Sequence, residues 1–116
     1  MLFRSVPIAF KAGAPKTALK IAPEQQAELD GVVALLEDRP DIRVLRIEAH
    51  WDATAGAKAK PMTDAQAAAV KAYLVGKGVP DARLETLGAG AERPLMPNIT
   101  PAYRARNRRV ELHIVR

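Results

Sequence analysis

The sequence of 116 residues contains no cysteine, and aromatic residues make up just 4% of it. The absence of cysteine excludes disulfides, thiolate metal sites and cysteine nucleophiles. The scarcity of aromatic residues argues against the stacking platforms that bind single-stranded nucleic acids. Long apolar runs are missing too, since none approaches the ~20 residues that a membrane-spanning helix needs. Arg4, Ser5 and Pro7 interrupt the N-terminal segment, which therefore does not have the apolar stretch of a signal peptide.

What the sequence does contain is the composition of a globular domain, with 48% hydrophobic and 27% charged residues. Its length predicts one domain, residues 1–116, which can bury a core without disulfides or metals. The net charge is +5, and six arginines stand against two glutamates from Glu92 onward. Such a basic region suggests an anionic partner, which could be nucleic acid, lipid headgroups or a carboxylate-rich polymer.

Hydrophobic periodicity predicts the strands. Within residues 108–115, Val110, Leu112 and Ile114 alternate with Arg109, Glu111 and His113, which is typical of a half-buried strand. Within residues 42–49, Leu45, Ile47 and Ala49 alternate with Arg46 and Glu48 and predict a second strand. Residues 6–10 alternate more weakly and predict a first strand, followed by a loop at residues 11–20. A further strand is predicted at residues 84–88.

Two helices are predicted between these strands. The first begins at Pro23, because proline is tolerated in the first turn, and ends before Arg39-Pro40. Apolar residues recur on one face of this helix, at Leu29, Val32, Val33 and Leu36. The second helix is predicted at about residues 64–74, with Thr63 as its N-cap.

The order of these elements predicts an α/β fold, a two-layer sandwich in the order β-α-β-α-β, a short helical turn at residues 101–106, and a last strand. Alternating strands and helices around one sheet place the helices on one face. Leu45 and Ile47 are expected to point toward the helices. Arg46 and Glu48 are expected to point outward, on a polar face that solvent reaches.

Motifs of catalysis are absent from the sequence, which has no G-x-S-x-G, P-loop or H-E-x-x-H pattern. The Gly88-Ala89-Gly90 segment lacks the third glycine and the long helix of a dinucleotide site. The two histidines, His50 and His113, lie on different predicted strands, and no third metal ligand is evident. The sequence therefore predicts no enzyme, no cofactor and no metal site.

The last third of the chain carries four motifs in a fixed order. They are Gly88-Ala89-Gly90, Arg93-Pro94, Asn98-Ile99-Thr100 and Arg104-Ala105-Arg106-Asn107-Arg108-Arg109-Val110-Glu111-Leu112. This order resembles the end of the OmpA-like peptidoglycan-binding domain, a family that includes the C-terminal domains of OmpA proteins, the lipoprotein Pal and the stator protein MotB. The resemblance covers about residues 6–115 and implies the OmpA-like β-α-β-α-β-(short α)-β mixed sheet with helices on one face. It also implies a periplasmic, outer-membrane-associated location, in which case this domain has been excised from a longer, anchored protein.

The resemblance further implies a site for the diaminopimelate residue of the peptidoglycan stem peptide. Members of the family bind it with an aspartate in a His-Thr-Asp motif after the second strand and with an arginine in a Leu-Ser-x-x-Arg-Ala pattern early in the second helix. The free end of the ligand is zwitterionic, so a carboxylate meets its ammonium group and a guanidinium meets its carboxylate in a bidentate pair. The helix N-terminus adds backbone donors for that carboxylate.

Part of this site matches the sequence, where His50-Trp51-Asp52 follows the second predicted strand. Asp52 is either the ammonium-binding carboxylate or a residue that caps a turn. Trp51 replaces the threonine and either packs in the core or stacks on a sugar ring. Arg108 matches the family's Asn-Arg-Arg motif and is either a ligand-binding residue or a solvated charge, whereas Arg109 is expected on the polar face of the sheet.

The family's arginine is absent, because Gln66 occupies its position, and Ala59 stands where many relatives carry an asparagine. Glutamine can donate a neutral hydrogen bond but cannot form a charged fork. The resemblance therefore implies noncovalent peptidoglycan binding of reduced affinity, with five ligand-binding residues, namely Asp52, Arg108, Gln66, His50 and Trp51. The alternative is an OmpA-like scaffold that has lost this ligand and binds an envelope protein. Neither interpretation involves nucleic acid, or a membrane other than through the missing anchor.

Overall fold

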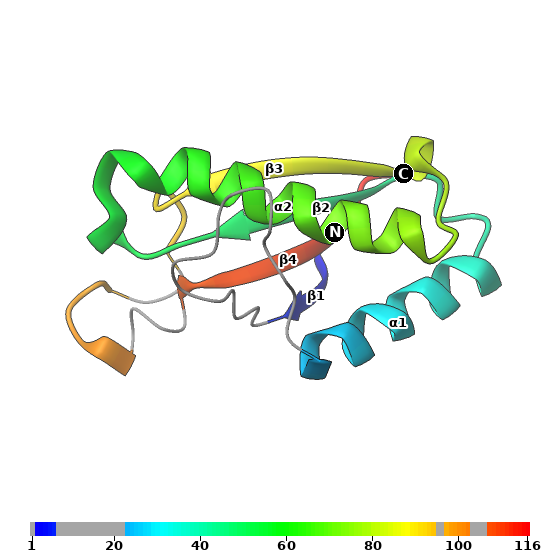
Figure 1. Ribbon diagram of the computed structural model, residues 1–116, viewed down its shortest axis with the longest axis horizontal. Helices are drawn as coiled ribbons and strands as arrows, with labels where there is room; N and C mark the ends of the chain where they lie inside the picture. The colour runs from blue at the N-terminus through cyan, green and yellow to red at the C-terminus, as the bar shows by residue number, and fades with distance from the viewer. Residues whose placement is uncertain (1, 7–22, 95–96, 103–106) are drawn as a thin grey trace.

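A four-stranded mixed sheet forms the centre of the computed structural model, which describes residues 2–6, 23–94, 97–102 and 107–116 (Figure 1). The strand order is β1-β4-β2-β3. β2 pairs with β3 in parallel and with β4 in antiparallel orientation, and β4 also pairs antiparallel with β1. The strands are β1 (Leu2–Val6), β2 (Leu45–His50), β3 (Leu84–Gly90) and β4 (Arg109–Ile114). The predicted α/β fold is confirmed.

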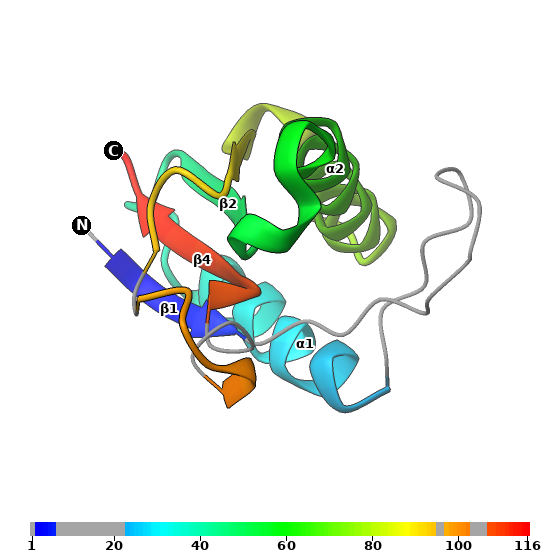
Figure 2. The same cartoon turned by 90° about the vertical axis from the view of Figure 1, so that its left-hand side faces the viewer.

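The two long helices, α1 (Pro23–Asp38) and α2 (Ala59–Gly76), lie on the same side of the sheet (Figure 2). α1 begins at Pro23 and ends before Arg39-Pro40, as predicted. Two short 3-10 helices, Ala53–Lys58 and Asp81–Arg83, join α2 to the sheet. None of the described helices is long and apolar enough to cross a membrane.

The hydrophobic core lies between the helices and one face of the sheet. Leu45 and Ile47 of β2 and Val110 and Leu112 of β4 are buried there, which confirms the predicted inward-facing set. The predicted apolar faces of the helices complete this core, with Leu29, Val32, Val33, Leu36, Ala67, Val70 and Leu74. Burial of each Leu, Ile or Val side chain contributes roughly 1.5–3 kcal/mol. This layer therefore fixes which strand residues face away from the helices.

The start of α2 differs from the prediction. The helix begins at Ala59, and Thr63 is a buried residue inside it rather than an N-cap. Its hydroxyl donates to the carbonyl of Ala59 at 2.9 Å. The helix starts early because Pro61 fits the first turn, where a missing N–H costs little, and because alanine favours helical geometry. The loop expected before it forms a 3-10 helix, Ala53–Lys58.

The first strand also differs from its predicted position. β1 spans Leu2–Val6, whereas the sequence pattern predicted residues 6–10. Residues 7–20, which include the rest of that predicted strand and the predicted loop, lie outside the described residues. Of the helical turn predicted at residues 101–106, Pro101 and Ala102 are helical, and the remaining four residues are likewise outside the description.

The other strands match the predictions more closely. β2 begins at Leu45 rather than at Ile42 and continues to His50. β3 extends two residues beyond its predicted end, to Gly90. β4 covers all but the first and last residues of its predicted range.

Two glutamates on the sheet face turned away from the helices are buried, which corrects the prediction that the polar side chains of this face point into solvent, whereas Arg46 stays partly exposed. Glu48 of β2 is 1% exposed, and Glu111 of β4 is 8% exposed. Strand alternation predicts the face on which a side chain lies, but not whether another segment covers that face. Here the segment after β3 approaches it, because Arg93 places a guanidinium nitrogen 3.5 Å from Glu48 Oε1.

Two glycines at the end of β3 allow α2 to lie against that strand. A Cβ atom on Gly88 would lie 2.4 Å from the backbone nitrogen of Asp64, which is too close for any other residue type. Gly90 has a φ of +59°, a conformation that favours glycine. Its N–H donates to the hydroxyl oxygen of Thr63 at 2.9 Å. The glycine motif therefore holds α2 close to the end of β3.

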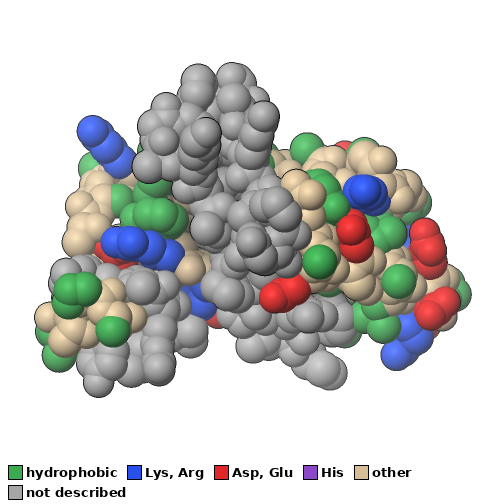
Figure 3. All heavy atoms as spheres, turned by 60° about the horizontal axis from the view of Figure 1, so that its bottom comes forward, with side chains coloured by type: hydrophobic (Ala, Val, Ile, Leu, Met, Phe, Trp, Pro, Cys, Tyr) green, Lys and Arg blue, Asp and Glu red, His purple; other side chains and the backbone are tan. Residues whose placement is uncertain are grey.

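The surface over α1 is acidic, as the right-hand part of Figure 3 shows. Asp30, Glu37 and Asp38 are exposed on this helix. The arginines that begin β4 lie elsewhere, at the end of β2 where Arg109 pairs with His50. An anionic partner is therefore expected to bind away from α1.

Candidate functional site

Two consecutive arginines at the start of β4 lead to two different polar clusters. Arg109 is the first residue of β4, and Arg108 precedes it. Because successive side chains of an extended chain point in opposite directions, the two guanidinium groups reach different partners. Arg108 bonds to Asp52, whereas Arg109 bonds to Glu111.

The first cluster, the Asp52 corner, consists of Asp52, Thr54, Trp51 and Arg108. Asp52 follows β2 and is the N-cap of the 3-10 helix Ala53–Lys58. Its Oδ1 accepts a hydrogen bond from the Thr54 backbone N–H at 2.8 Å and another from the Thr54 hydroxyl. Its Oδ2 accepts a hydrogen bond from Arg108 Nε. Asp52 is thus a turn cap, as one prediction held, and it also fixes an arginine.

The partners of Arg108 hold it without covering it. Its guanidinium carbon lies 5.0 Å from the centroid of the Trp51 ring, which is cation–π geometry. The Asp52 side chain is 0% exposed, whereas the Arg108 side chain is 41% exposed. Trp51 is half-buried, and its backbone N–H donates to the carbonyl of Gly90 at 2.8 Å. Asp52 and Trp51 therefore hold the Arg108 guanidinium in place while leaving it open to solvent.

The electrostatics of the corner keep Asp52 ionised. Burial by itself would raise the pKa of this carboxyl, but the hydrogen bonds from Thr54 and Arg108 outweigh burial and hold the pKa below its usual value. A buried carboxylate that is bonded in this way is a fixed negative charge at neutral pH. It orients the neighbouring guanidinium rather than offering a free acceptor to solvent.

An asparagine pair, which the sequence interpretation missed, ties the next segment to this corner. Asn98 Oδ1 accepts hydrogen bonds from the Ala53 backbone N–H at 3.3 Å and from Asn107 Nδ2 at 2.9 Å. Asn107 is fully buried. The Asn-x-Thr motif and the asparagine before Arg108 were the signal, but the sequence did not show that they meet.

Gln66, the predicted replacement for the family's arginine, is buried in α2. It is the eighth residue of this helix, so it lies about two turns from the N-terminus and its backbone donors. No hydrogen bond joins Gln66 to Asp52 among the residues that the structure describes. Ala59, the other departure, is the buried first residue of the same helix.

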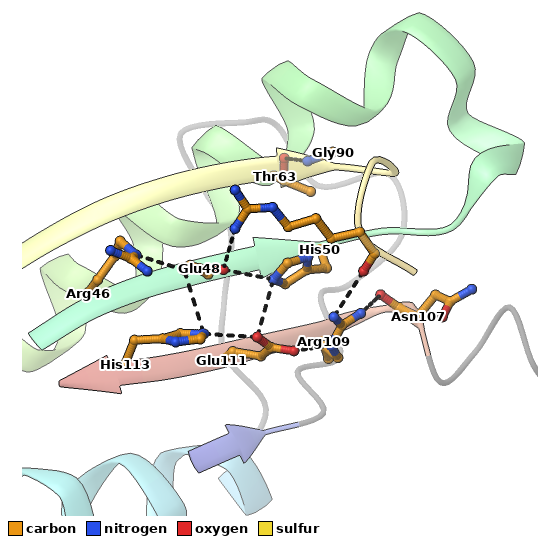
Figure 4. Close-up of polar contacts among 10 residues, drawn as sticks. Arg46, Glu48, His50, Thr63, Gly90, Asn107, Arg109, Glu111 and His113 are labelled. Carbon is orange, nitrogen blue, oxygen red and sulfur yellow. Dashed lines mark hydrogen bonds and ion pairs between the residues drawn. The ribbon is translucent and has the colours of Figure 1, made fainter. Parts of the chain in front are cut away.

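The second group of polar side chains, the sheet-face cluster, lies on β2 and β4 (Figure 4). Arg109 Nε donates to Glu111 Oε2 at 2.6 Å, and Arg46 Nε donates to Glu48 Oε2 at 2.7 Å. Arg109 also donates to the carbonyl of Arg93 at 3.0 Å. The structure places His50 here rather than in the Asp52 corner. The cluster consists of Arg46, Glu48, His50, Arg109, Glu111 and His113.

Burial and charge set the protonation of this cluster. Burial lowers the pKa of His50, and the charge of Arg109 lowers it further despite Glu48 and Glu111 nearby. Burial would raise the pKa of Glu111, but hydrogen bonds from His113 and Arg109 outweigh it, so this pKa is lowered. The cluster thus combines a neutral imidazole with an ionised carboxylate. Glu48, Glu111 and His113 offer ligand atoms that all lie within 4.8 Å of one another, a spacing that could hold a metal ion.

Known proteins resemble this chain over most of its length. The model of the OmpA family matches residues 15–108. Outer membrane protein A of Bordetella avium is 50% identical over 54 residues, which cover 47% of this chain and 28% of that protein. "Peptidoglycan-binding protein ArfA" of Mycobacterium tuberculosis is 36% identical over 93 residues, which cover 79% of this chain and 28% of that protein.

A solved structure shows the same fold. The crystal structure of the peptidoglycan-associated lipoprotein from Burkholderia pseudomallei matches with a TM-score of 0.79 and 27% sequence identity, and the match covers 95% of this chain and 88% of that one. The chain spans 28% of the length of the two curated relatives above. The match of the family model over residues 15–108 leads to one conclusion. The chain belongs to the OmpA family.

Proposed function

We propose that this domain binds peptidoglycan noncovalently in the cell envelope, at the Asp52 corner, with no catalytic step. Family membership supports this proposal, as do relatives whose names describe peptidoglycan binding or association. The domain would serve as the wall-binding part of a longer, anchored protein, on the periplasmic side of the outer membrane.

The observation that carries the proposal is the exposed guanidinium of Arg108, which the buried Asp52 carboxylate holds in place. Asp52 and Trp51 fix this side chain from below, and 41% of it faces solvent. A pre-oriented guanidinium loses little entropy when it binds a carboxylate, and it can bind in bidentate geometry. The free carboxylates of the peptidoglycan stem peptide are ligands of this kind. We assign the contact with the diaminopimelate carboxylate to Arg108.

The same geometry suggests that the affinity is reduced. Both oxygens of Asp52 already accept hydrogen bonds, from Thr54 and from Arg108. A ligand ammonium group must therefore compete with these donors for a carboxylate that solvent does not reach. Gln66 adds no charge to replace the arginine of the family. We propose that the site binds stem peptide more weakly than relatives that carry this arginine.

Binding to purified sacculi at moderate salt tests the proposal. Arg108→Gln should lower the bound fraction strongly, because it removes the exposed cation but keeps a side chain of similar length. Arg43→Gln is the matched control, since Arg43 is an exposed arginine just before the opposite end of β2. Equal losses in the two variants would show nonspecific charge attraction and contradict a site at the corner. Binding to duplex DNA, measured in parallel, distinguishes peptidoglycan binding from binding to phosphate groups, because phosphate binding weakens steeply with salt.

A second candidate function is protein binding by a scaffold that has lost the wall ligand. The observation in its favour is the closed state of Asp52, whose side chain is fully buried beneath Arg108. The two functions differ in how the domain binds sacculi. Stem peptide that releases the domain from sacculi supports wall binding through the corner. Failure of the folded domain to bind sacculi at all favours a protein partner within the envelope.

A further inference from the structure

Beyond wall binding, the sheet-face cluster contains a closed ring of potential metal ligands (Figure 4). His50 Nε2 lies 3.3 Å from Glu48 Oε1 and 3.7 Å from Glu111 Oε1. His113 Nε2 lies 2.9 Å from Glu111 Oε1 and 3.5 Å from Glu48 Oε2. Each imidazole thus faces both carboxylates, and each carboxylate faces both imidazoles.

We propose that this ring binds one divalent transition-metal ion of the Zn²⁺ class, through His50, His113, Glu48 and Glu111. Zn²⁺ is bound by imidazole nitrogen and carboxylate oxygen at about 2.0–2.2 Å in tetrahedral geometry, which separates neighbouring ligand atoms by about 3.3 Å. The four separations in the ring, from 2.9 to 3.7 Å, bracket this value. Glu48, Glu111 and His113 already offer ligand atoms that all lie within 4.8 Å of one another, and His50 must turn toward them to complete the site.

The backbone builds this ring from one short motif used twice. Glu48 and His50 are separated by one residue on β2, and Glu111 and His113 are separated by one residue on β4. Glutamate–x–histidine places both side chains on the same face of a strand. The antiparallel register pairs Glu48 directly with Glu111, which brings the two motifs together. The sequence contains two histidines in all, and both lie in this ring.

An independent observation is that His50 makes no hydrogen bond with the described residues, although its Nε2 lies 3.3 Å from Glu48 Oε1. It is 2% exposed, and neither of its ring nitrogens makes a hydrogen bond in the described part of the chain. A buried polar group without a partner is costly and rare in native proteins. Its Nε2 points into the ring, between the two carboxylates. A metal ion there would give this nitrogen a partner.

The neighbouring arginines orient the carboxylates as outer partners of metal ligands commonly do. Arg109 bonds Glu111 Oε2 and leaves Oε1 facing both histidines. Arg46 bonds Glu48 Oε2, the oxygen that also faces His113, and leaves Oε1 facing His50. Arg93 lies 3.5 Å from Glu48 Oε1 and competes with an ion, but its side chain is 62% exposed and can turn into solvent.

The charge of the ring also favours a cation. Glu48, Glu111 and Arg109 are the strongly buried charges, with side chains at most 11% exposed, so the buried net charge is −1. Arg46 and Arg93 are partly solvated and therefore screened. His113 is partly exposed and gives an ion access to the ring.

Titration of tag-free protein with Zn²⁺ by calorimetry tests the proposal. We expect one ion per chain, and Co²⁺ at the same site should show the intense visible absorption of tetrahedral coordination. His113→Gln should weaken Zn²⁺ binding at least about tenfold, because losing even an outer partner of a ligand commonly costs 10–100-fold. Glu85→Gln is the matched control, a carboxylate that contacts Arg46 from β3 without facing the ring. It should bind Zn²⁺ as the wild type does.

A measurement on the wild type alone guards against a variant that does not fold. The ring nitrogens of both histidines should shift in the ¹⁵N NMR spectrum and saturate together at one equivalent of Zn²⁺. A shift of one histidine alone would overturn the proposal, because the ring requires both. Absence of stoichiometric binding, or equal binding by His113→Gln and wild type, would overturn it as well. Neither result bears on peptidoglycan binding, which uses the Asp52 corner.

Discussion

Arg108 and Arg109 are adjacent in sequence, yet the surroundings of their guanidinium groups are opposite. Each bonds to a carboxylate that is largely withdrawn from solvent, Asp52 for Arg108 and Glu111 for Arg109. The Arg108 side chain is 41% exposed and stacks on Trp51, whereas the Arg109 side chain is 6% exposed and bonds to two backbone carbonyls as well. One arginine is available to a ligand, and the other is part of the interior.

The difference arises because neighbouring side chains of an extended chain point in opposite directions, so one can face solvent while the next is buried. An ion pair with one solvated partner contributes little to stability, but its charge can still bind a ligand. A buried pair is costly to break, because the remaining charge has no solvent to compensate it. We therefore expect variants of Arg109 to affect folding and variants of Arg108 to affect binding.

The largest effect is expected from Arg109→Met. This change removes the guanidinium that donates to Glu111 Oε2 and to the carbonyls of Asn107 and Arg93, while His113 still contacts Glu111 Oε1. Breaking a buried pair in this way typically costs about 3–5 kcal/mol of unfolding free energy. Urea denaturation followed by circular dichroism measures the loss. A loss below ~1 kcal/mol would mean that the sheet-face cluster does not support the fold.

A smaller effect on stability is expected from Thr63→Val, which tests the scaffold of the Asp52 corner. The variant removes the hydroxyl oxygen that accepts the buried Gly90 N–H. The carbonyl of Gly90 in turn accepts the backbone N–H of Trp51. An unsatisfied buried donor costs about 1–3 kcal/mol. Thr86→Val on β3 is the control, since Thr86 is exposed and its loss should stay within ~0.5 kcal/mol. Equal stabilities for the two variants would contradict a structural role for the Thr63–Gly90 bond.

Arg108→Gln should lower the unfolding free energy by less than ~1 kcal/mol, because the guanidinium is half solvated and screened. Thr54 continues to donate to Asp52 in this variant. The same urea experiment applies, with Arg43→Gln as the reference for the loss of one exposed arginine. A destabilisation as large as that of Arg109→Met would remove the contrast between the two regions.

The smallest change is expected for Gln66→Arg, which restores the charge of the family's arginine. A charged fork that reaches the ligand would strengthen stem-peptide binding by about three- to thirtyfold. Gln66 is buried, so the new side chain must extend past the packed side of α2 to reach solvent. We therefore expect a gain near threefold in calorimetric affinity. Unchanged affinity, even after Ala59→Asn is added, would favour the protein-binding alternative.

Much of the fold follows from the sequence, because the hydrophobic periodicity of a strand or helix is a local property of the sequence. The strict alternation at β4 and the apolar face of α1 predicted the core correctly. The burial of Glu48 was not predictable in the same way, since it depends on Arg93 reaching across from a segment 45 residues later. The start of α2 was missed because Thr63 resembles an N-cap in sequence, while its hydroxyl binds the backbone inside the helix.

In the candidate site, too, the sequence identified residues from local motifs but did not predict their contacts with distant residues. His50 and Asp52 are two residues apart, so sequence motifs group them, but the structure assigns them to different clusters. The pairing of Glu48 with Glu111 arises from strand register, which the sequence does not state. Arg108 was identified from its motif, and its partner Asp52 was identified from another. The bond between them required the structure.

The central claim is that Arg108 forms the wall-binding contact while Arg109 supports the fold. Calorimetric titration of wild type and Arg108→Gln with soluble diaminopimelate stem peptide tests it most directly. A lost charge-assisted hydrogen bond of about 1.5–3 kcal/mol predicts at least about tenfold weaker binding by a variant that remains folded. Stem-peptide affinity that is the same in wild type and Arg108→Gln would contradict the claim.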